Sequence, residues 1–101
     1  MKRRFLVSVS GLSEDETTRL REFLGKKAAW WNWIPNFWLL ITGNQEITCE
    51  AIRDKVIGLN GEAKCLVMEI GPDIDWATLG GANKDGKRMT DWLNDTWAAE
   101  D

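Results

Sequence analysis

Residues 30–42 read WWNWIPNFWLLIT, two short aromatic and aliphatic runs that are joined through Ile34, Pro35 and Asn36. Aromatic and β-branched side chains favour the half-buried surface of a sheet, and a Pro-Asn pair between two such runs favours a tight reversal of the chain. The stretch therefore predicts a β-hairpin whose two strands turn at Pro35.

The segment before the hairpin carries the signals of a strand followed by a helix. Residues 4–10, RFLVSVS, alternate between apolar and mostly small polar side chains, which is the period of a strand. Ser13 and Glu16 have the spacing of a capping box, in which the hydroxyl and the carboxylate satisfy each other's backbone N–H groups at a helix start. A first strand and a helix that ends near Gly25 are therefore predicted.

The same two signals recur after the hairpin. Thr48 has the position of a helix N-cap, and apolar residues then follow at helical spacing as far as Leu59. Residues 63–70, AKCLVMEI, form another alternating strand, which Gly71-Pro72 terminates. The order of elements is β-α-β-β-α-β, the split βαβ or ferredoxin-like arrangement of an α+β protein.

Two further elements are predicted beyond this core. Residues 75–79, DWATL, have the composition of a short extra edge strand, which could extend its own sheet or reach a partner subunit. A C-terminal amphipathic helix of about three turns follows from the helical spacing of Met89, Trp92, Leu93 and Trp97. We expect a single ferredoxin-like domain over residues 1–101, with its core at 4–79 and a C-terminal helical tail at 87–98.

Composition is that of an ordinary globular domain. The chain has 101 residues, of which 44% are hydrophobic and 29% charged, so wholesale disorder is not expected. No run approaches the ~20 apolar residues of a membrane span, and the basic N-terminus leads into a strand rather than a signal-peptide core. We expect a cytoplasmic protein without membrane contact. Histidine is absent, and Cys49 and Cys65 lack CxxC spacing, so we expect reduced core thiols and no metal or cofactor.

Charge gives only a local hint of a partner. The net charge of −3 is not the strongly basic balance of a typical nucleic-acid binder. A smaller basic patch remains possible if the two ends of the first strand-helix unit meet at one sheet edge, where they would contribute Lys2, Arg3, Arg4, Lys26 and Lys27. The alternative is that these are solvated surface residues.

Seven tryptophans occur, and four of them crowd the hairpin. Trp31 and Trp33 are expected on one face of the second strand and Trp30 on the other, so helices on a single face cannot cover them all. The other face must then be covered by the C-terminal helix, by a second copy of the protein, or by stacked bases of a single-stranded nucleic acid.

Two segments carry patterns that occur in nucleotide-binding or catalytic sites. Residues 81–87, GANKDGK, match the start of a phosphate-cradling loop, but Arg88 stands where that motif needs a hydroxyl for magnesium, and a glycine-rich linker is the alternative. Asp73 and Asp75 follow the last core strand, which contains Glu69, and such carboxylates can hold magnesium for phosphodiester hydrolysis or simply cap a loop.

Three segments together resemble a known family. FWLLIT, EAIRDKV and CLVMEI are similar to segments of the small ferredoxin-like proteins of CRISPR adaptation, the Cas-two-like family, and more closely to their SinR-like relatives. Those relatives carry a Trp-Leu-Ile/Leu strand, a helix with Ile-Arg-Asp and a later Trp-Ala pair. The matching residues here are Trp38-Leu39-Leu40, Ile52-Arg53-Asp54 and Trp76-Ala77, within residues 4–79.

The chain departs from that family at one functional position. Nuclease members place an aspartate at the end of the first strand, one from each subunit, to hold a metal ion across a symmetric dimer. Ser8, Ser10 and Gly11 occupy that segment here, and Asp15 lies beyond the capping serine. Because a hydroxyl does not replace the charge of a carboxylate toward a divalent cation, the resemblance implies the fold and a homodimer more than hydrolysis.

We therefore predict a non-catalytic binding or interaction module, dimeric, that contacts nucleic acid or a protein partner in a CRISPR-adaptation-like, mobile-element or defence context. A metal-dependent nuclease using Asp73 and Asp75, and a small regulatory subunit without a ligand, remain alternatives. The residues predicted to line the interaction surface are Trp31, Trp33 and Trp76, with Lys2, Arg3 and Arg4 as phosphate contacts if the ligand is nucleic acid.

Overall fold

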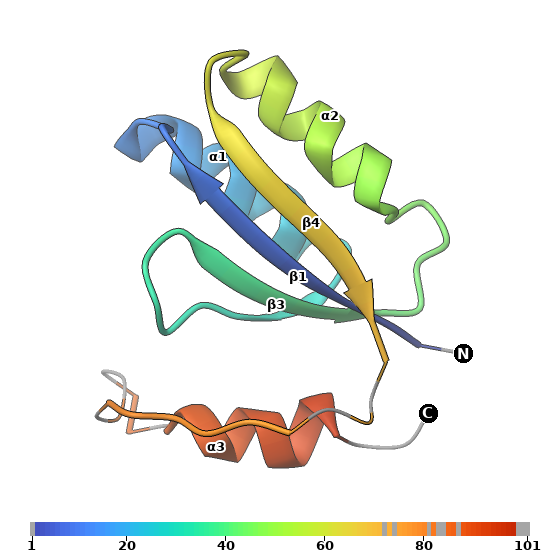
Figure 1. The fold of residues 1–101 in the computed structure, drawn as a ribbon, viewed down its shortest axis with the longest axis vertical. Coiled ribbons are helices and arrows are strands. Elements are labelled where there is room, and N and C mark those ends of the chain that lie inside the picture. The colour runs from blue at the N-terminus through green and yellow to red at the C-terminus, as the bar shows by residue number, and fades with distance from the viewer. Residues whose placement is uncertain are drawn as a thin grey trace.

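A four-stranded antiparallel sheet organises the chain, as the computed structural model shows for residues 2–71, 73, 75–80, 82, 85–86 and 88–98 (Figure 1). The strand order is β2-β3-β1-β4, and every neighbouring pair is antiparallel. The two central strands are therefore the first and third along the chain. The strands are β1 (Arg3–Ser10), β2 (Ala29–Trp31), β3 (Phe37–Thr42) and β4 (Lys64–Ile70).

Two helices cover one face of this sheet, α1 (Glu14–Gly25) and α2 (Cys49–Leu59) (Figure 1). The predicted capping box at the start of α1 is present, with the Glu16 backbone N–H donating to Ser13 Oγ at 3.1 Å and the Ser13 N–H donating to the Glu16 carboxylate at 2.8 Å. At the start of α2 the Thr48 hydroxyl oxygen accepts from the backbone N–H of a residue in the first turn at 3.0 Å. Both helices begin where the sequence predicts.

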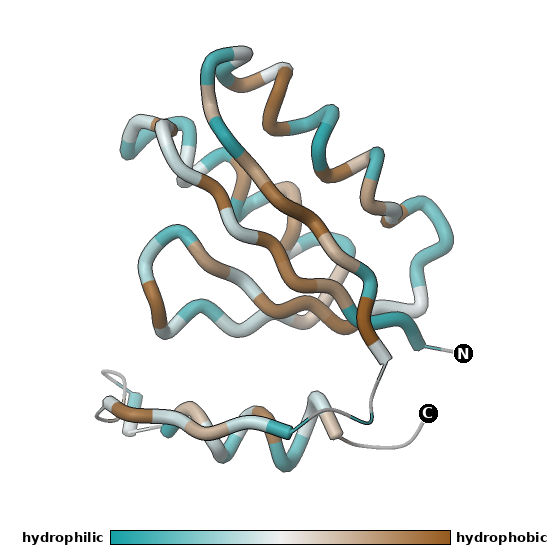
Figure 2. Tube along the Cα trace, viewed as in Figure 1, coloured by the Kyte–Doolittle hydropathy of each residue, from teal (hydrophilic) through white to brown (hydrophobic). Residues whose placement is uncertain are grey.

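The main core lies between these helices and the sheet. Alternate residues of the strands point into it, and Figure 2 shows hydrophobic residues recurring along β1, β3 and β4. Burial of such side chains contributes about 1.5–3 kcal/mol each relative to exposure, so this layer supplies most of the drive to fold. Its buried members are Phe5, Val7, Val9, Leu20, Leu24, Trp38, Leu40, Ile47, Ile52 and Val56.

The opposite face of the sheet is covered in part by the C-terminal region. Helix α3 (Met89–Trp92) continues without a break into a π-helical turn, η1 (Leu93–Trp97), and lies across the sheet from α1 and α2 (Figure 1). Together with the extended residues 75–80 we call this region the C-terminal cover. A second core cluster, built on Trp31, Leu93 and Trp97, joins it to the sheet.

The C-terminal cover differs from the sequence-based predictions in two respects. Residues 75–79 form no strand, because the segment packs its Trp76 into the second cluster instead of pairing with an edge. The C-terminal helix is shorter than the predicted 87–98, and its last turn is π-helical rather than α-helical. The Gly81–Lys87 loop and Pro72 belong largely to the undescribed residues, with Gly81, Asn83, Lys84 and Lys87 outside the described part of the chain.

The hairpin also differs from its prediction in one respect. β2 ends at Trp31, so Trp33 lies in the connecting loop and not on the strand. Asn32 explains this early end, because its side-chain amide donates to the backbone oxygens of Ile34 at 3.1 Å and Phe37 at 2.7 Å and so bridges the loop. Asn36 closes the reversal at φ 63°, a left-handed conformation that asparagine tolerates better than most residues.

The molecule is thus a small α+β domain with an antiparallel sheet between two helices on one side and a helical cover on the other. None of the helices formed by the described residues has the length and the apolar character that a membrane crossing requires.

Candidate functional site

Trp31 lies beneath the C-terminal cover. Its side chain is only 3% exposed and belongs to the cluster that contains Leu93 and Trp97. Its ring centroid is 5.6 Å from that of Trp33 and 6.0 Å from that of Phe37, the second contact edge to face. Of the three coverings considered for this face, the structure shows the C-terminal helix, and a base could reach Trp31 only if the cover moved.

Trp33 and Trp76 are half-buried at the border of the same cluster. The backbone N–H of Trp76 donates to its neighbour Asp75 at 3.0 Å, which fixes the chain where it enters the cover. All seven tryptophans fall among the described residues, and none of their side chains is largely exposed. The predicted aromatic residues are therefore brought together, but as a packed cluster.

The three predicted basic residues have different environments. Lys2 is exposed, whereas Arg3 forms an ion pair with Glu69 at 3.3 Å and lies with its guanidinium 5.0 Å from the centroid of the Phe5 ring. Arg4 is only 6% exposed and its Nε donates to the backbone oxygen of Trp97 at 2.8 Å. Arg4 therefore anchors the C-terminal cover to β1, although the two lie at opposite ends of the described sequence.

A shallow basic depression lies where the N-terminus meets the end of α1. Lys2, Lys26 and Lys27 line an open hollow of about 420 Å³ together with Thr42 and backbone of the β3–α2 loop. The sequence-based suggestion that the two basic groups meet at one place is supported for these lysines, while Arg3 and Arg4 do not line the hollow.

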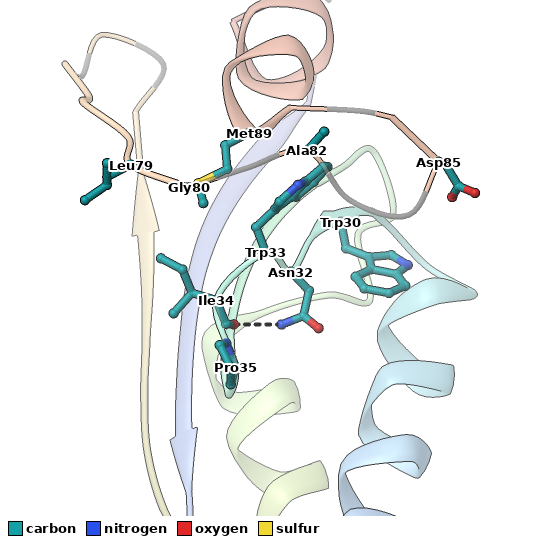
Figure 3. Close-up of a pocket in the computed structure, with 10 residues that line it drawn as sticks. All are labelled: Trp30, Asn32, Trp33, Ile34, Pro35, Leu79, Gly80, Ala82, Asp85 and Met89. Atoms are coloured by element: carbon teal, nitrogen blue, oxygen red, sulfur yellow. Dashed lines mark hydrogen bonds between the residues drawn. The ribbon is translucent and has the colours of Figure 1, made fainter.

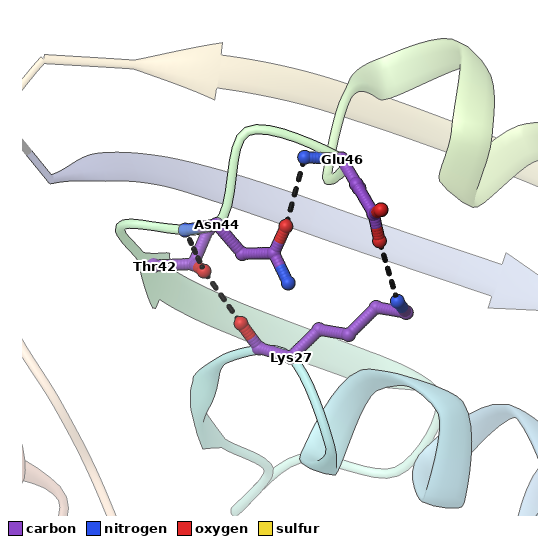
Figure 4. A network of polar contacts seen from close by, with 4 residues as sticks. All are labelled: Lys27, Thr42, Asn44 and Glu46. Atoms are coloured by element: carbon purple, nitrogen blue, oxygen red, sulfur yellow. Dashed lines mark hydrogen bonds and ion pairs between the residues drawn. The ribbon is translucent and has the colours of Figure 1, made fainter.

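The rim of this depression is held by a polar network (Figure 4). The Thr42 hydroxyl donates to the backbone oxygen of Lys27 and accepts from the Asn44 backbone N–H at 2.9 Å. The Asn44 side chain accepts from the Glu46 N–H at 2.8 Å, and Lys27 Nζ pairs with the Glu46 carboxylate at 3.1 Å. The network joins the end of α1 to the loop that precedes α2.

The carboxylates considered for metal binding are not gathered into a site. Asp73 and Asp75 are exposed, and Glu69 is engaged with Arg3. Within the described ranges, no three Asp, Glu, Cys or His side chains are close enough to share a metal ion. Cys49 and Cys65 are free thiols and half-buried.

The capping box lowers the pKa of the Glu16 carboxyl. The backbone N–H of Ser13 stabilises the charged form of Glu16, with smaller help from Asn60, the Ser13 hydroxyl and Arg19, and so lowers its pKa below the ordinary glutamate value. The pKa shift therefore arises from the capping box, in which Glu16 has a structural role.

An apolar strip on β4 was not predicted from the sequence. Leu66 and Met68 project from the face of the sheet that lacks α1 and α2, with 56% and 47% of their side chains exposed. Across the ladder they pair with Ser8 and Leu6 of β1, and no strand of the described residues lies on the other side of β4. The period-2 pattern of residues 63–70 already placed both side chains on one face, and only the position of β4 at the sheet edge was unknown.

A cavity and an adjoining groove under the C-terminal cover were also missed. The cavity, of about 250 Å³, lies between Trp31 and Leu39 of the sheet and Leu93 of the cover. The groove, of about 860 Å³, is more open and is bordered by Trp33, Ile34 and Met89 among others (Figure 3). Neither has a signal in the sequence, because both depend on where residues 75–80 cross the sheet.

Comparison of the chain with protein-family models, with curated proteins and with solved structures found no match.

Proposed function

We propose that this protein is a non-catalytic interaction module with a ferredoxin-like fold that forms a homodimer through the exposed edge of β4. The single observation that carries the proposal is the pair of exposed apolar side chains, Leu66 and Met68, on a strand that pairs with β1 on one side and lies at the edge of the described sheet.

The ferredoxin-like assignment is supported by the order of elements and strands. Two β-α-β units share one antiparallel sheet, with β1 and β3 in the middle and β2 and β4 at the edges. An arrangement of this kind is expected of a split βαβ fold and supports the assignment. The motifs that resemble those of SinR-like and CRISPR-adaptation proteins lie on β3, on α2 and in the C-terminal cover, and this resemblance is the basis for proposing a defence or mobile-element context.

The edge of β4 lacks most of the features that keep edges monomeric. Natural sheets protect exposed edges with proline, inward-pointing charges, bulges or a covering element. The seven residues of β4 contain no proline, and their charges stand near the ends, at Lys64 and Glu69. The C-terminal cover lies against the β2–β3 half of the sheet and leaves Leu66 and Met68 exposed.

Symmetric pairing of this edge places the apolar strips of the two subunits side by side and covers part of each. A two-fold axis normal to the sheet at Val67 sets β4 antiparallel to its copy and brings Leu66 opposite the partner subunit's Met68 on the same face. Cross-strand apolar pairs of this kind contribute about 0.2–1 kcal/mol each beyond the new backbone hydrogen bonds. The result is one continuous eight-stranded sheet, a closed dimer with no further growth along β4.

The decisive test compares two lysine substitutions at equally exposed apolar positions. Leu66 on β4 is 56% exposed and Ile57 on α2 is 55% exposed. We expect sedimentation equilibrium to show a dimer for the wild type and for Ile57→Lys, and a monomer for Leu66→Lys. A monomeric wild type, or equal weakening by both substitutions, would contradict the proposal.

Nucleic-acid binding is a second candidate, favoured by the hollow that Lys2, Lys26 and Lys27 share. Phosphate contacts made by lysines release counterions, so affinity falls steeply with salt. If the hollow binds a phosphate backbone, Lys26→Ala should weaken binding of labelled single-stranded RNA and reduce the slope of log affinity against log salt by about one. Equal binding by Lys26→Ala and wild type at every salt concentration would exclude the hollow.

The same binding assay separates the remaining alternatives. With magnesium or manganese present, strand cleavage that disappears in the Asp73→Ala, Asp75→Ala double variant would identify a metal-dependent nuclease. A protein that neither dimerises nor responds to nucleic acid would fit a regulatory subunit without a ligand.

A further inference from the structure

The cavity beneath the C-terminal cover has the size of a small-molecule site. Its volume is about 250 Å³. A dry cavity of about 150 Å³ suffices to bind benzene, and sites for drug-sized ligands begin near 300 Å³. The space therefore suits a molecule of about two fused rings.

Its lining is uncharged and mostly apolar and aromatic, with a hydroxyl at Thr78. The sheet contributes Trp31, Phe37 and Leu39, and the cover contributes chiefly Trp76 and Trp97. Among the described residues that line it, none carries a charge. Because no opposite charge lines the space, an ion would lose its hydration without gaining an ion pair, so the lining disfavours ions.

Two of the lining side chains have an unused hydrogen-bond donor. Trp31 is 3% exposed and Trp97 is 0% exposed, and the indole N–H of each finds no acceptor among the described residues. A buried donor without a partner costs about 1–3 kcal/mol, and most native proteins satisfy such groups. An acceptor atom supplied by a ligand would relieve that cost.

The mouth of the cavity is apolar as well. Ile34 and Leu79 border both the cavity and the adjoining groove, and their side chains are 47% and 96% exposed. A leucine exposed to this degree beside an apolar opening is a natural point of contact for a ligand that projects from the cavity.

We propose that this cavity is a binding site for an uncharged, largely apolar molecule of about two rings that carries one hydrogen-bond acceptor. The acceptor binds the indole N–H of Trp31 or Trp97, and the apolar body lies between the sheet and the C-terminal cover. The site is on the opposite half of the sheet from Leu66 and Met68, so it does not depend on dimer formation.

Three probes of nearly equal shape test the chemistry on the full chain. These are 2-acetylnaphthalene, which has a ketone acceptor, 2-ethylnaphthalene, which has none, and 2-naphthoate, which is charged. We expect the ketone to bind about five-fold more tightly than the hydrocarbon, the equivalent of one net hydrogen bond, and the carboxylate to bind most weakly. In a spectrum of the ¹⁵N-labelled protein, the ketone alone should move an indole N–H proton of Trp31 or Trp97 downfield.

A matched pair of alanine substitutions tests the location. Ala77 lines the cavity, and Ala82 lines only the neighbouring groove; both are exposed, so a phenylalanine at either position is compatible with folding. Ala77→Phe should fill the cavity and lower the affinity for 2-acetylnaphthalene at least ten-fold, whereas Ala82→Phe should change that affinity by less than two-fold.

Four results would overturn the proposal. They are the absence of saturable binding by 2-acetylnaphthalene, tightest binding by 2-naphthoate, unchanged affinity in Ala77→Phe, and a loss confined to Ala82→Phe. The probe comparison needs no variant, so it decides the chemistry even if a substitution perturbs the cover.

Discussion

Thr42 is the residue on which the junction of α1, β3 and α2 depends most. Its side chain is 4% exposed, and its hydroxyl both donates to Lys27 and accepts from Asn44 (Figure 4). Valine has nearly the same shape but cannot make either hydrogen bond. The substitution therefore leaves two backbone groups without this partner in a partly buried place.

We expect Thr42→Val to lower the free energy of unfolding by about 1–3 kcal/mol, measured by urea denaturation. Thr18→Val is the matched control, since the Thr18 hydroxyl donates to the Glu14 backbone oxygen at 3.0 Å on the exposed side of α1. That variant should change stability by less than about 0.5 kcal/mol. Equal effects of the two substitutions would show that the network adds no stability beyond that of an exposed hydroxyl.

Glu16 gives the capping box a pH dependence. Its folded pKa is lowered, chiefly by the Ser13 backbone N–H, so its contribution to stability is fully present above the unfolded pKa of a glutamate, about 4.3. The contribution is lost as pH falls through the folded pKa. Glutamine at this position keeps the size of the side chain but has no carboxylate to titrate.

Glu16→Gln should therefore be less stable than the wild type at pH 7, and the difference should shrink as pH falls below about 4.3. Thermal unfolding between pH 7 and pH 3 measures it. Glu14→Gln, in the same first turn but outside the capping box, controls for the general effect of removing a negative charge near a helix start. A difference from wild type that stays constant across this range would rule out the capping carboxylate as its source.

Among the elements, the C-terminal cover depends on a small number of anchors. Trp97 is fully buried against Trp31 and Leu93, and its backbone oxygen accepts from Arg4. Trp92 lies in the same helical stretch but is only half-buried. Its ring centroid is 6.1 Å from that of Trp97. The two indoles thus differ mainly in how much packing each provides.

Trp97→Ala should cost about 3–5 kcal/mol of stability, the usual range for a buried tryptophan, and Trp92→Ala clearly less. Loss of Trp97 should also expose Trp31, seen as a red shift of the remaining tryptophan fluorescence. A blue-shifted or unchanged spectrum in Trp97→Ala would mean that the cover stays closed without its largest anchor.

The elements that the sequence predicted well are those with a strong local pattern. Alternation in residues 4–10 and 63–70 and the capping signals at Ser13 and Thr48 identify two strands and two helices correctly. The prediction of an edge strand at 75–79 was wrong because Trp76 packs against the face of the sheet opposite α1 and α2, a tertiary contact with no local signature. The strip on β4 and the cavity escaped prediction for the same reason, since both depend on which strand lies at the edge and where the cover crosses.

For the molecule as a whole, the proposed dimer makes stability depend on concentration. Association of folded chains stabilises the folded state by mass action, so the melting temperature of the wild type should rise with protein concentration. Leu66→Lys should show the same melting temperature at every concentration, while Ile57→Lys should follow the wild type. Calorimetry over a hundred-fold range of concentration measures this, and a concentration-independent wild type would argue against the dimer.

The hydrogen bond from Arg4 to Trp97 joins residues that are 93 positions apart in the sequence. This separation affects the order in which the sheet and its cover form during synthesis. Synthesis is vectorial, at about 5–20 residues per second, so all four strands leave the ribosome before the residues of η1 do. During that interval Trp31, Phe37 and Leu39 are not covered by the C-terminal helix. The nascent chain therefore exposes an apolar, aromatic surface that chaperones can bind, for some seconds, until the last helical turn emerges and buries it.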